Sequence, residues 1–127
     1  MEYLAIFIGS GWLGWLIDSS FRSWKEKRLT SGTLLPYFSL AYATASLALY
    51  HLFNVWSASF FSHILVGTLL CIAVEFVGGK MAWQVLRRRL WDYRKNRWNY
   101  LGFIDAEHSF YWLGLTTLYR YIFGLQF

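Results

Sequence analysis

Residues 9–18 read GSGWLGWLID, and the interpretation of this stretch decides the class of protein. Gly9, Gly11 and Gly14 form the pattern G-x-G-x-x-G, which in a dinucleotide-binding turn follows a β-strand and opens a helix. Only eight residues precede Gly9, and the pattern lies within one continuous apolar run. Small residues at such a spacing also let transmembrane helices approach closely. The context therefore favours a membrane helix over a phosphate-binding loop.

The composition of the 127-residue chain favours the same interpretation. Hydrophobic residues make up 57% of the chain and charged residues 15%, whereas soluble domains contain about 25% charged residues. A soluble domain of this size needs more polar side chains to cover its surface. A bilayer removes that need, so the sequence predicts a single transmembrane domain, residues 1–127.

Four apolar stretches are candidates for membrane-spanning helices, because about 20 mostly apolar residues cross the hydrocarbon core. Asp18 interrupts the first stretch and Glu75 the third, while the second has no charge. The fourth carries Arg120 and is short, so its helix is expected to begin near Ile104. The sequence predicts an all-α integral membrane four-helix bundle with spans at about 3–21, 29–53, 60–79 and 104–126.

The distribution of basic residues predicts the orientation of this bundle. Eleven of the twelve Lys and Arg residues follow the first or the third span, and residues 54–59 contain none. Basic loops stay on the cytoplasmic side, so both are expected inside and both chain termini outside. The eleven are Arg22, Lys25, Lys27, Arg28, Lys80, Arg87, Arg88, Arg89, Arg94, Lys95 and Arg97.

Residues 80–98, KMAWQVLRRRLWDYRKNRW, form a basic and aromatic segment between the third and fourth helices. Trp83, Leu86 and Leu90 recur at helical spacing, which is typical of a segment in the headgroup layer with its charges toward anionic lipid. The charge is equally explained as a topology signal, and nucleic-acid binding is not expected beside membrane spans. The candidate headgroup ligands are Arg87, Arg88 and Arg89.

Acidic side chains at membrane depth usually face a partner, a cavity or a pathway, because they are costly there. Asp18 and Glu75 each lie about 15 residues into their spans, roughly 22 Å from the outer end. In one interpretation Asp18 pairs with Arg22 and Glu75 with Lys80, and the pairs only fix packing. In the other the acids build an ion-coordinating or headgroup-binding site. The members of this polar membrane site would be Asp18, Glu75, Asp105, Glu107 and His108.

No pattern in the sequence indicates a cofactor, a metal ion or a covalent catalyst. His51 and His63 are expected near the outer surface without an acid beside them. Cys71, the only cysteine, lies in an apolar helix, where burial disfavours the thiolate. His108, next to Glu107, is the better candidate for a proton-linked role. The sequence thus favours a protein that is not an enzyme and holds no cofactor or metal.

Residues 91–104, WDYRKNRWNYLGFI, resemble the hallmark of the bacterial type IV ABC-transporter permeases, the CmpB-type small membrane proteins. That family has Trp-Asp-Tyr, a short polar stretch, an aromatic residue with Asn, then Gly and Ile, and later Ser and Trp. The matching residues are Trp91, Asp92, Tyr93, Trp98, Asn99, Gly102, Ile104, Ser109 and Trp112. Elsewhere the resemblance is carried by Gly14, Trp15, Leu16, Asp18, Gly32, Leu34 and Glu75.

The resemblance covers nearly the whole chain, with two departures. Asp18 stands where Glu is usual, and of the prolines usual in the second helix only Pro36 is present, in a shifted register. It implies a multi-pass protein of the bacterial inner membrane that works in transport. One copy of this length hardly encloses a translocation path, so a homo-oligomer or a partner membrane subunit is implied. An ATPase, if one takes part, is a separate chain.

Five of the matching residues, which we call the interface motif, also have a physical interpretation: Trp91, Asp92, Tyr93, Asn99 and Gly102. Trp91 and Tyr93 are typical interfacial anchors, and Asp92 between them suits the start of a helix. Asn99 and Gly102 favour a turn that redirects the chain into the fourth span and satisfies backbone groups there. The motif is predicted to hold the basic segment against the bundle.

The sequence therefore predicts a permease-like or accessory transport subunit with an acidic polar site toward the cytoplasmic side. One alternative is a membrane-embedded lipid-modifying enzyme, with Glu75 or Glu107 as base, His108 as proton carrier and residues 87–89 holding a phosphate. The other is a structural subunit that docks a larger membrane complex through its glycines and aromatic rings. The expected partners are the bilayer, its anionic headgroups and a further subunit; no nucleic acid is expected.

Overall fold

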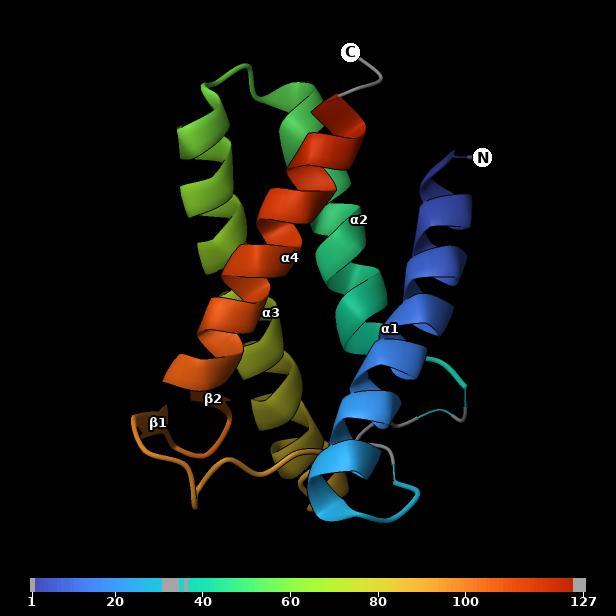
Figure 1. The fold of residues 1–127 in the computed structure, drawn as a ribbon, viewed down its shortest axis with the longest axis vertical. Helices are drawn as coiled ribbons and strands as arrows, with labels where there is room; N and C mark the ends of the chain where they lie inside the picture. The colour runs from blue at the N-terminus through green and yellow to red at the C-terminus, as the bar shows by residue number, and fades with distance from the viewer. Residues whose placement is uncertain (1, 31–34, 36, 125–127) are drawn as a thin grey trace.

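The computed structural model describes residues 2–30, 35 and 37–124. In this part of the chain four helices run alternately up and down: α1 (Glu2–Glu26), α2 (Leu40–Val55), α3 (Phe60–Leu86) and α4 (Ala106–Gly124) (Figure 1). Between α3 and α4 lies a small antiparallel ladder of β1 (Asn99–Tyr100) and β2 (Ile104–Asp105). The regular structure of the described residues is thus helical apart from this ladder and an isolated bridge between Leu35 and Phe38, and the predicted all-α class is confirmed.

Two of the helices extend past the predicted spans. α1 continues from Phe21 to Glu26, and α3 continues from Gly79 to Leu86. The predicted ends mark where charged residues begin, but charged residues are good helix formers and keep the backbone bonded. α3 ends only at Arg87, which has a left-handed backbone (φ 55°) and whose N–H bonds to the carbonyl of Trp83. The helical part of the basic segment is therefore a continuation of α3.

The second helix is shorter than the predicted span 29–53. It begins at Leu40, because the Ser39 side chain caps it by accepting a hydrogen bond from the Tyr42 N–H. Leu29 lies before the helix and is 98% exposed. Pro36 and residues 31–34, which include Gly32 and Leu34 of the resemblance, lie outside the described residues.

Length and composition single out two candidate membrane helices within the described ranges, α1 and α3. α2 has 16 residues, a length of about 24 Å, against a hydrocarbon core of about 30 Å. α4 has 19 residues. Two of the four predicted spans thus meet the usual criterion for crossing a bilayer.

The glycines of the opening stretch bring α1 and α2 together. A Cβ atom at Gly11 would overlap the Phe38 ring, and one at Gly14 would overlap the Cβ and Cγ atoms of Tyr42. The Gly11 carbonyl also accepts a 2.8 Å hydrogen bond from the Ser39 N–H. Gly9 has open space around it. The G-x-G-x-x-G pattern is therefore a helix-packing feature that uses two of its three glycines.

The remaining helices pack in chain order, α2 on α3 and α3 on α4. Their shared core contains Ala45, Leu49, Cys71 and Trp112.

The two ends of the described bundle differ in the number of basic residues that they carry. The start of α1 and the end of α4 lie at one end (Figure 1), where Arg120 Nε donates to His63 Nδ1 at 3.0 Å. The loops that follow α1 and α3, which carry the basic clusters, lie at the other end.

Replacement of Gly14 by Ala should destabilise the protein by about 1–3 kcal/mol, because the new methyl group overlaps atoms next to the Tyr42 backbone. The measurement is the free energy of unfolding of the full chain in a mild detergent. Gly9→Ala is the matched control and should be neutral or slightly stabilising, because Ala is the better helix former and nothing obstructs it. Equal effects of the two substitutions would contradict this packing.

Candidate functional site

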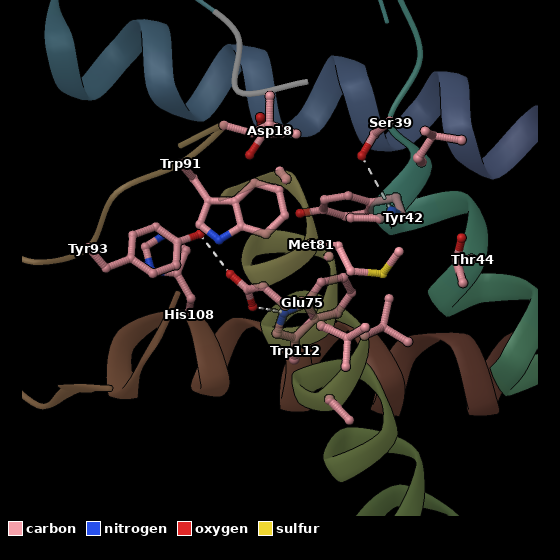
Figure 2. A pocket seen from close by; sticks show the side chains of 18 of the residues that line it. Asp18, Ser39, Tyr42, Thr44, Glu75, Met81, Trp91, Tyr93, His108 and Trp112 are labelled. Carbon is pink, nitrogen blue, oxygen red and sulfur yellow. Dashed lines mark hydrogen bonds between the residues drawn. The ribbon is translucent and has the colours of Figure 1, made fainter. Parts of the chain in front are cut away.

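A cavity of about 720 Å³ lies at the basic end of the bundle, among α1, α2, α3, α4 and the chain between α3 and α4 (Figure 2). Its wall is mostly apolar and includes Met81 and Val85 on α3, both exposed side chains. The cavity therefore opens at the side of the bundle. Its charged side chains are Asp18, Arg22 and Glu75, and His108 also lines it.

Glu75 is the central polar group of this cavity. It lies in α3 and is only 5% exposed. Its Oε1 atom accepts a 2.7 Å hydrogen bond from the Tyr93 hydroxyl, and its Oε2 atom accepts one from the Trp112 indole N–H (Figure 2). Because an unbonded buried carboxylate is very costly, these two donors hold three parts of the chain together at one point.

Tyr93 connects Glu75 to a second polar cluster. Its ring stacks on the His108 ring, with centroids 4.0 Å apart and planes at 14°. Asp105, only 3% exposed, accepts hydrogen bonds from His108 Nδ1 at 2.7 Å and from the His108 backbone N–H at 2.8 Å. The second of these bonds caps the first turn of α4. Asn96 donates to the other Asp105 oxygen at 2.5 Å.

Asp18 and Arg22 form an ion pair on the α1 side of the cavity. Arg22 Nε lies 3.0 Å from Asp18 Oδ2 and 3.2 Å from Oδ1. Four residues separate the two, which places them on one helix face. Both residues line the cavity. The sequence offered two alternatives for Asp18, an ion pair with Arg22 or membership of a polar site, and the structure combines them.

The interface motif folds back onto α3. We call residues 87–105 the folded-back segment. Trp91 lies against Gly79, where a Cβ atom would come within 3.2 Å of the indole ring. The Trp91 indole N–H donates to the Phe103 carbonyl at 2.9 Å, and the Tyr93 N–H donates to the Gly102 carbonyl at 2.9 Å. These bonds direct the Tyr93 side chain inward to Glu75.

Asn99 and Gly102 form the turn of this segment. The Asn99 side chain accepts from the Gly102 N–H at 3.0 Å and donates to the Asn96 carbonyl at 2.8 Å. Gly102 has a φ of +75°, where a side chain would be strained. Asp92 caps no helix here. It is exposed and accepts from the Arg94 backbone and guanidinium, which lowers the pKa of its carboxyl group.

Tyr93 has a perturbed phenol. Burial raises its pKa above the ordinary value of 10, and the nearby Glu75 carboxyl group acts in the same direction. The phenol therefore keeps its proton and acts as a hydrogen-bond donor. It cannot serve as a phenolate base under ordinary conditions.

Glu107, predicted as a member of the polar site, does not line the cavity. Its carboxylate binds Lys25 Nζ at 2.9 Å and accepts from the Tyr111 hydroxyl at 2.7 Å. This contact joins the end of α1 to the start of α4. The structure thus brings Asp18, Glu75 and His108 together at the cavity, places Asp105 behind His108 and leaves Glu107 near both but outside the lining.

Lys80 forms no ion pair with Glu75 among the described residues. Five residues along a helix correspond to about 500°, which leaves the two side chains roughly 140° apart around the axis. Lys80 Nζ instead lies 5.9 Å from the centroid of the Phe76 ring. The expected pair is therefore replaced by a cation–π contact, and Glu75 depends on Tyr93 and Trp112.

The three consecutive arginines differ in their surroundings. Arg87 caps α3 through its backbone, and Arg88 is exposed. Arg89 folds inward: its guanidinium donates to the Leu101 carbonyl at 3.0 Å and lies 4.6 Å from the Phe103 ring centroid. None of the three lines the cavity. Only Arg87 and Arg88 thus present free side chains that could meet a headgroup.

The chain is similar to one family of proteins over nearly its whole length. The family model described as "Putative ABC-transporter type IV" matches residues 5–126. The chain belongs to this family. No curated protein and no solved structure was found to match it. Membership of the ABC-transporter type IV family is consistent with the two apolar helices and indicates a transport-related membrane protein.

Two residues that line the cavity of this family member were not predicted as members of the polar site, although Trp112 was among the residues that match the family. Tyr42 lines the cavity from α2, and Trp112 bonds to Glu75 from α4. A signal for Trp112 was present, because it follows His108 by four residues and so lies on the same helix face. Tyr42 had no such signal, since its position depends on where α2 begins.

Asp105, Glu107 and His108 are the described residues that come nearest to a metal-binding group. One ligand atom from each lies within 4.8 Å of the others. Asp105 and His108 are bonded to each other, and Glu107 is bonded to Lys25. A metal ion would have to break these contacts, so the cluster is better explained as the junction of α1, α4 and the folded-back segment.

Tyr93→Phe should lower the free energy of unfolding by about 1–3 kcal/mol, because it leaves one oxygen of the buried Glu75 without a donor. Tyr100→Phe is the control, since Tyr100 is 60% exposed, and it should change stability by less than about 0.5 kcal/mol. Unfolding of the full chain in mild detergent measures both. Equal stability of the two variants would show that the bond to Glu75 contributes nothing.

Proposed function

We propose that the chain is a small inner-membrane transport subunit, permease-like or accessory, whose ligand site is the cavity around Glu75. Its four helices would cross the membrane with both termini outside and the cavity toward the cytoplasmic face. The observation that carries this proposal is the buried Glu75 at the wall of a laterally open cavity. A buried ionisable group inside a membrane helix is the usual mark of a substrate or ion pathway.

The surface of α1 supports insertion in a bilayer. Large apolar side chains point outward along its whole length, among them Leu4, Ile8, Trp12 and Leu16, each at least 42% exposed. On a soluble protein such a continuous apolar face would cause aggregation. In lipid it is the expected outer surface.

The distribution of charge supports the orientation. The basic stretches at 22–28, which spans the end of α1 and the residues after it, and at 87–97 lie at the same end of the bundle. Basic residues beside membrane spans favour the cytoplasmic side. α2 and α4 are short for spans, and the bilayer can adapt to short helices by local thinning. The exposed Arg87 and Arg88 would then meet anionic headgroups.

The size of the chain supports a partner. α1 packs mainly against α2, and one cavity open at the side is not a path across the membrane. A homo-oligomer or a second membrane subunit would complete the path. The family description implies ATP coupling, for which the ATPase would be a separate chain.

The orientation can be tested by labelling introduced cysteines in intact cells. In a Cys71→Ser background, Ser57→Cys should react with an impermeant maleimide from outside, because Ser57 is exposed in the loop between α2 and α3. Arg88→Cys should react only after the cells are broken. Labelling of Arg88→Cys in intact cells would invert the proposed orientation.

Coupling to an ATPase can be tested on the complex purified from native membranes through a tag on this chain. Glu75→Gln should reduce the ATP hydrolysis of that complex about tenfold or more, with the recovery of the chain unchanged. Glu26→Gln removes the same charge from an exposed position outside the cavity and should have no effect. If Glu75→Gln alters recovery alone, the acid serves assembly and the transport role fails.

A further inference from the structure

We infer that the cavity binds a lipophilic organic cation, a quaternary ammonium or phosphonium group carried by an apolar body. This inference rests on the proposed function and names the class of ligand for its site. Three independent features of the cavity support it: an unbalanced negative charge, a surround of aromatic rings and a long apolar wall.

The charges of the cavity leave one carboxylate without a cation. Of its three charged lining residues, Asp18 and Arg22 neutralise each other at 3.0 Å. Glu75 is bonded by two uncharged donors, the Tyr93 hydroxyl and the Trp112 indole N–H. With Glu75 ionised and His108 neutral, the described lining carries a formal charge of −1, which a monovalent cation would balance. The same charge disfavours anions, since the Arg22 guanidinium is already held by Asp18.

Aromatic rings surround this carboxylate. Figure 2 shows Glu75 among the side chains of Tyr42, Trp91, Tyr93 and Trp112, which come from α2, the folded-back segment and α4. The rings of Tyr42 and Trp112 have centroids 5.0 Å apart. Cages of aromatic rings recognise quaternary ammonium groups, because the negative ring faces attract a cation that carries no hydrogen-bond donors.

The same surroundings disfavour small inorganic cations. Calcium needs six to eight oxygen ligands and magnesium keeps several waters. The cavity instead offers two carboxylates that are already bonded, Asp18 to Arg22 and Glu75 through both of its oxygens, together with indole and phenol rings. An organic cation needs no shell of oxygen ligands, so it fits this lining better.

The apolar wall provides room for the body of the ligand. Val77, Met81 and Val85 follow one another at four-residue spacing along α3, all exposed and all lining the cavity. They lead from Glu75 toward the basic end of the bundle. The volume of about 720 Å³ lies within the range of about 300–1,000 Å³ of small-molecule sites. A bulky apolar cation could therefore place its charge at Glu75 and its body along this row.

The test uses tetraphenylphosphonium and tetraphenylborate, which share four phenyl groups and differ in the sign of their charge. Binding of each radiolabelled ion to the full chain in dodecyl maltoside is measured by equilibrium dialysis. We expect saturable binding of the phosphonium and at least about tenfold weaker binding of the borate, because the latter places like charge beside Glu75. Equal binding of the two ions, or no saturable binding of the phosphonium, overturns the inference.

Variants test whether the phosphonium binds in the cavity around Glu75. Glu75→Gln should weaken phosphonium binding at least about tenfold, whereas the control Glu26→Gln should leave it unchanged. Because Glu75→Gln risks misfolding, Val77→Trp serves as a second variant, which fills the cavity and leaves the Glu75 bonds intact. Size-exclusion chromatography confirms that each variant is folded. Unchanged binding in a folded Val77→Trp protein places the cation elsewhere and overturns the inference.

Two further experiments distinguish a lipid headgroup from a free cation, and an error in the ligand class from an error in the proposed transport role. In phosphatidylglycerol nanodiscs, added phosphatidylcholine should compete with the phosphonium if the natural group is a lipid headgroup; unchanged binding would indicate a free lipophilic cation. Tetramethylammonium, which has no apolar body, should compete at least about tenfold more weakly. If cation binding fails while the Glu75-dependent ATP hydrolysis persists, the ligand class is wrong and the transport role stands.

Discussion

The structure depends on the need to satisfy a carboxylate that is buried in an apolar helix. Glu75 lies within α3, far from either end, where it is only 5% exposed and bonds to no charged side chain of α3 among the described residues. Its two oxygens are bonded by Tyr93 and Trp112. Because a buried charge without partners is prohibitively costly, the chain after α3 must return to the helix, and α4 must present its indole to the same point.

The interface motif follows from this constraint. Tyr93 reaches Glu75 only if the folded-back segment lies close against α3. Gly79 permits this by leaving room for Trp91, and the turn at Gly102 accepts the left-handed backbone that reverses the chain. Asp105 then caps α4 and bonds to His108, whose ring supports that of Tyr93. Of the residues that the sequence groups as a polar membrane site, Asp105 and His108 thus contact Glu75 only through Tyr93.

The same arrangement leaves a cavity that no helix fills. α1 contacts α2 through Gly11 and Gly14 and joins α4 through the pair of Lys25 and Glu107, and the space between these contacts remains open. An acid fixed by neutral donors, enclosed by aromatic rings and open to the side of the bundle, is suited to an amphiphilic cation. The chain belongs to a transporter family, so a ligand of this cavity is expected to be a transported substrate.

The sequence by itself indicated a membrane environment, the helical class and the family, and it offered the pairing of Asp18 with Arg22 as one of two interpretations, because these depend on composition, on motifs and on neighbours along one helix. It also indicated the turn at Asn99 and Gly102. Only the tertiary structure decided that Glu75 bonds to Tyr93 and Trp112 instead of Lys80, and that Glu107 bonds to Lys25. These contacts join residues 18 to 82 positions apart, and local periodicity carries no information about which distant side chains meet around a shared cavity.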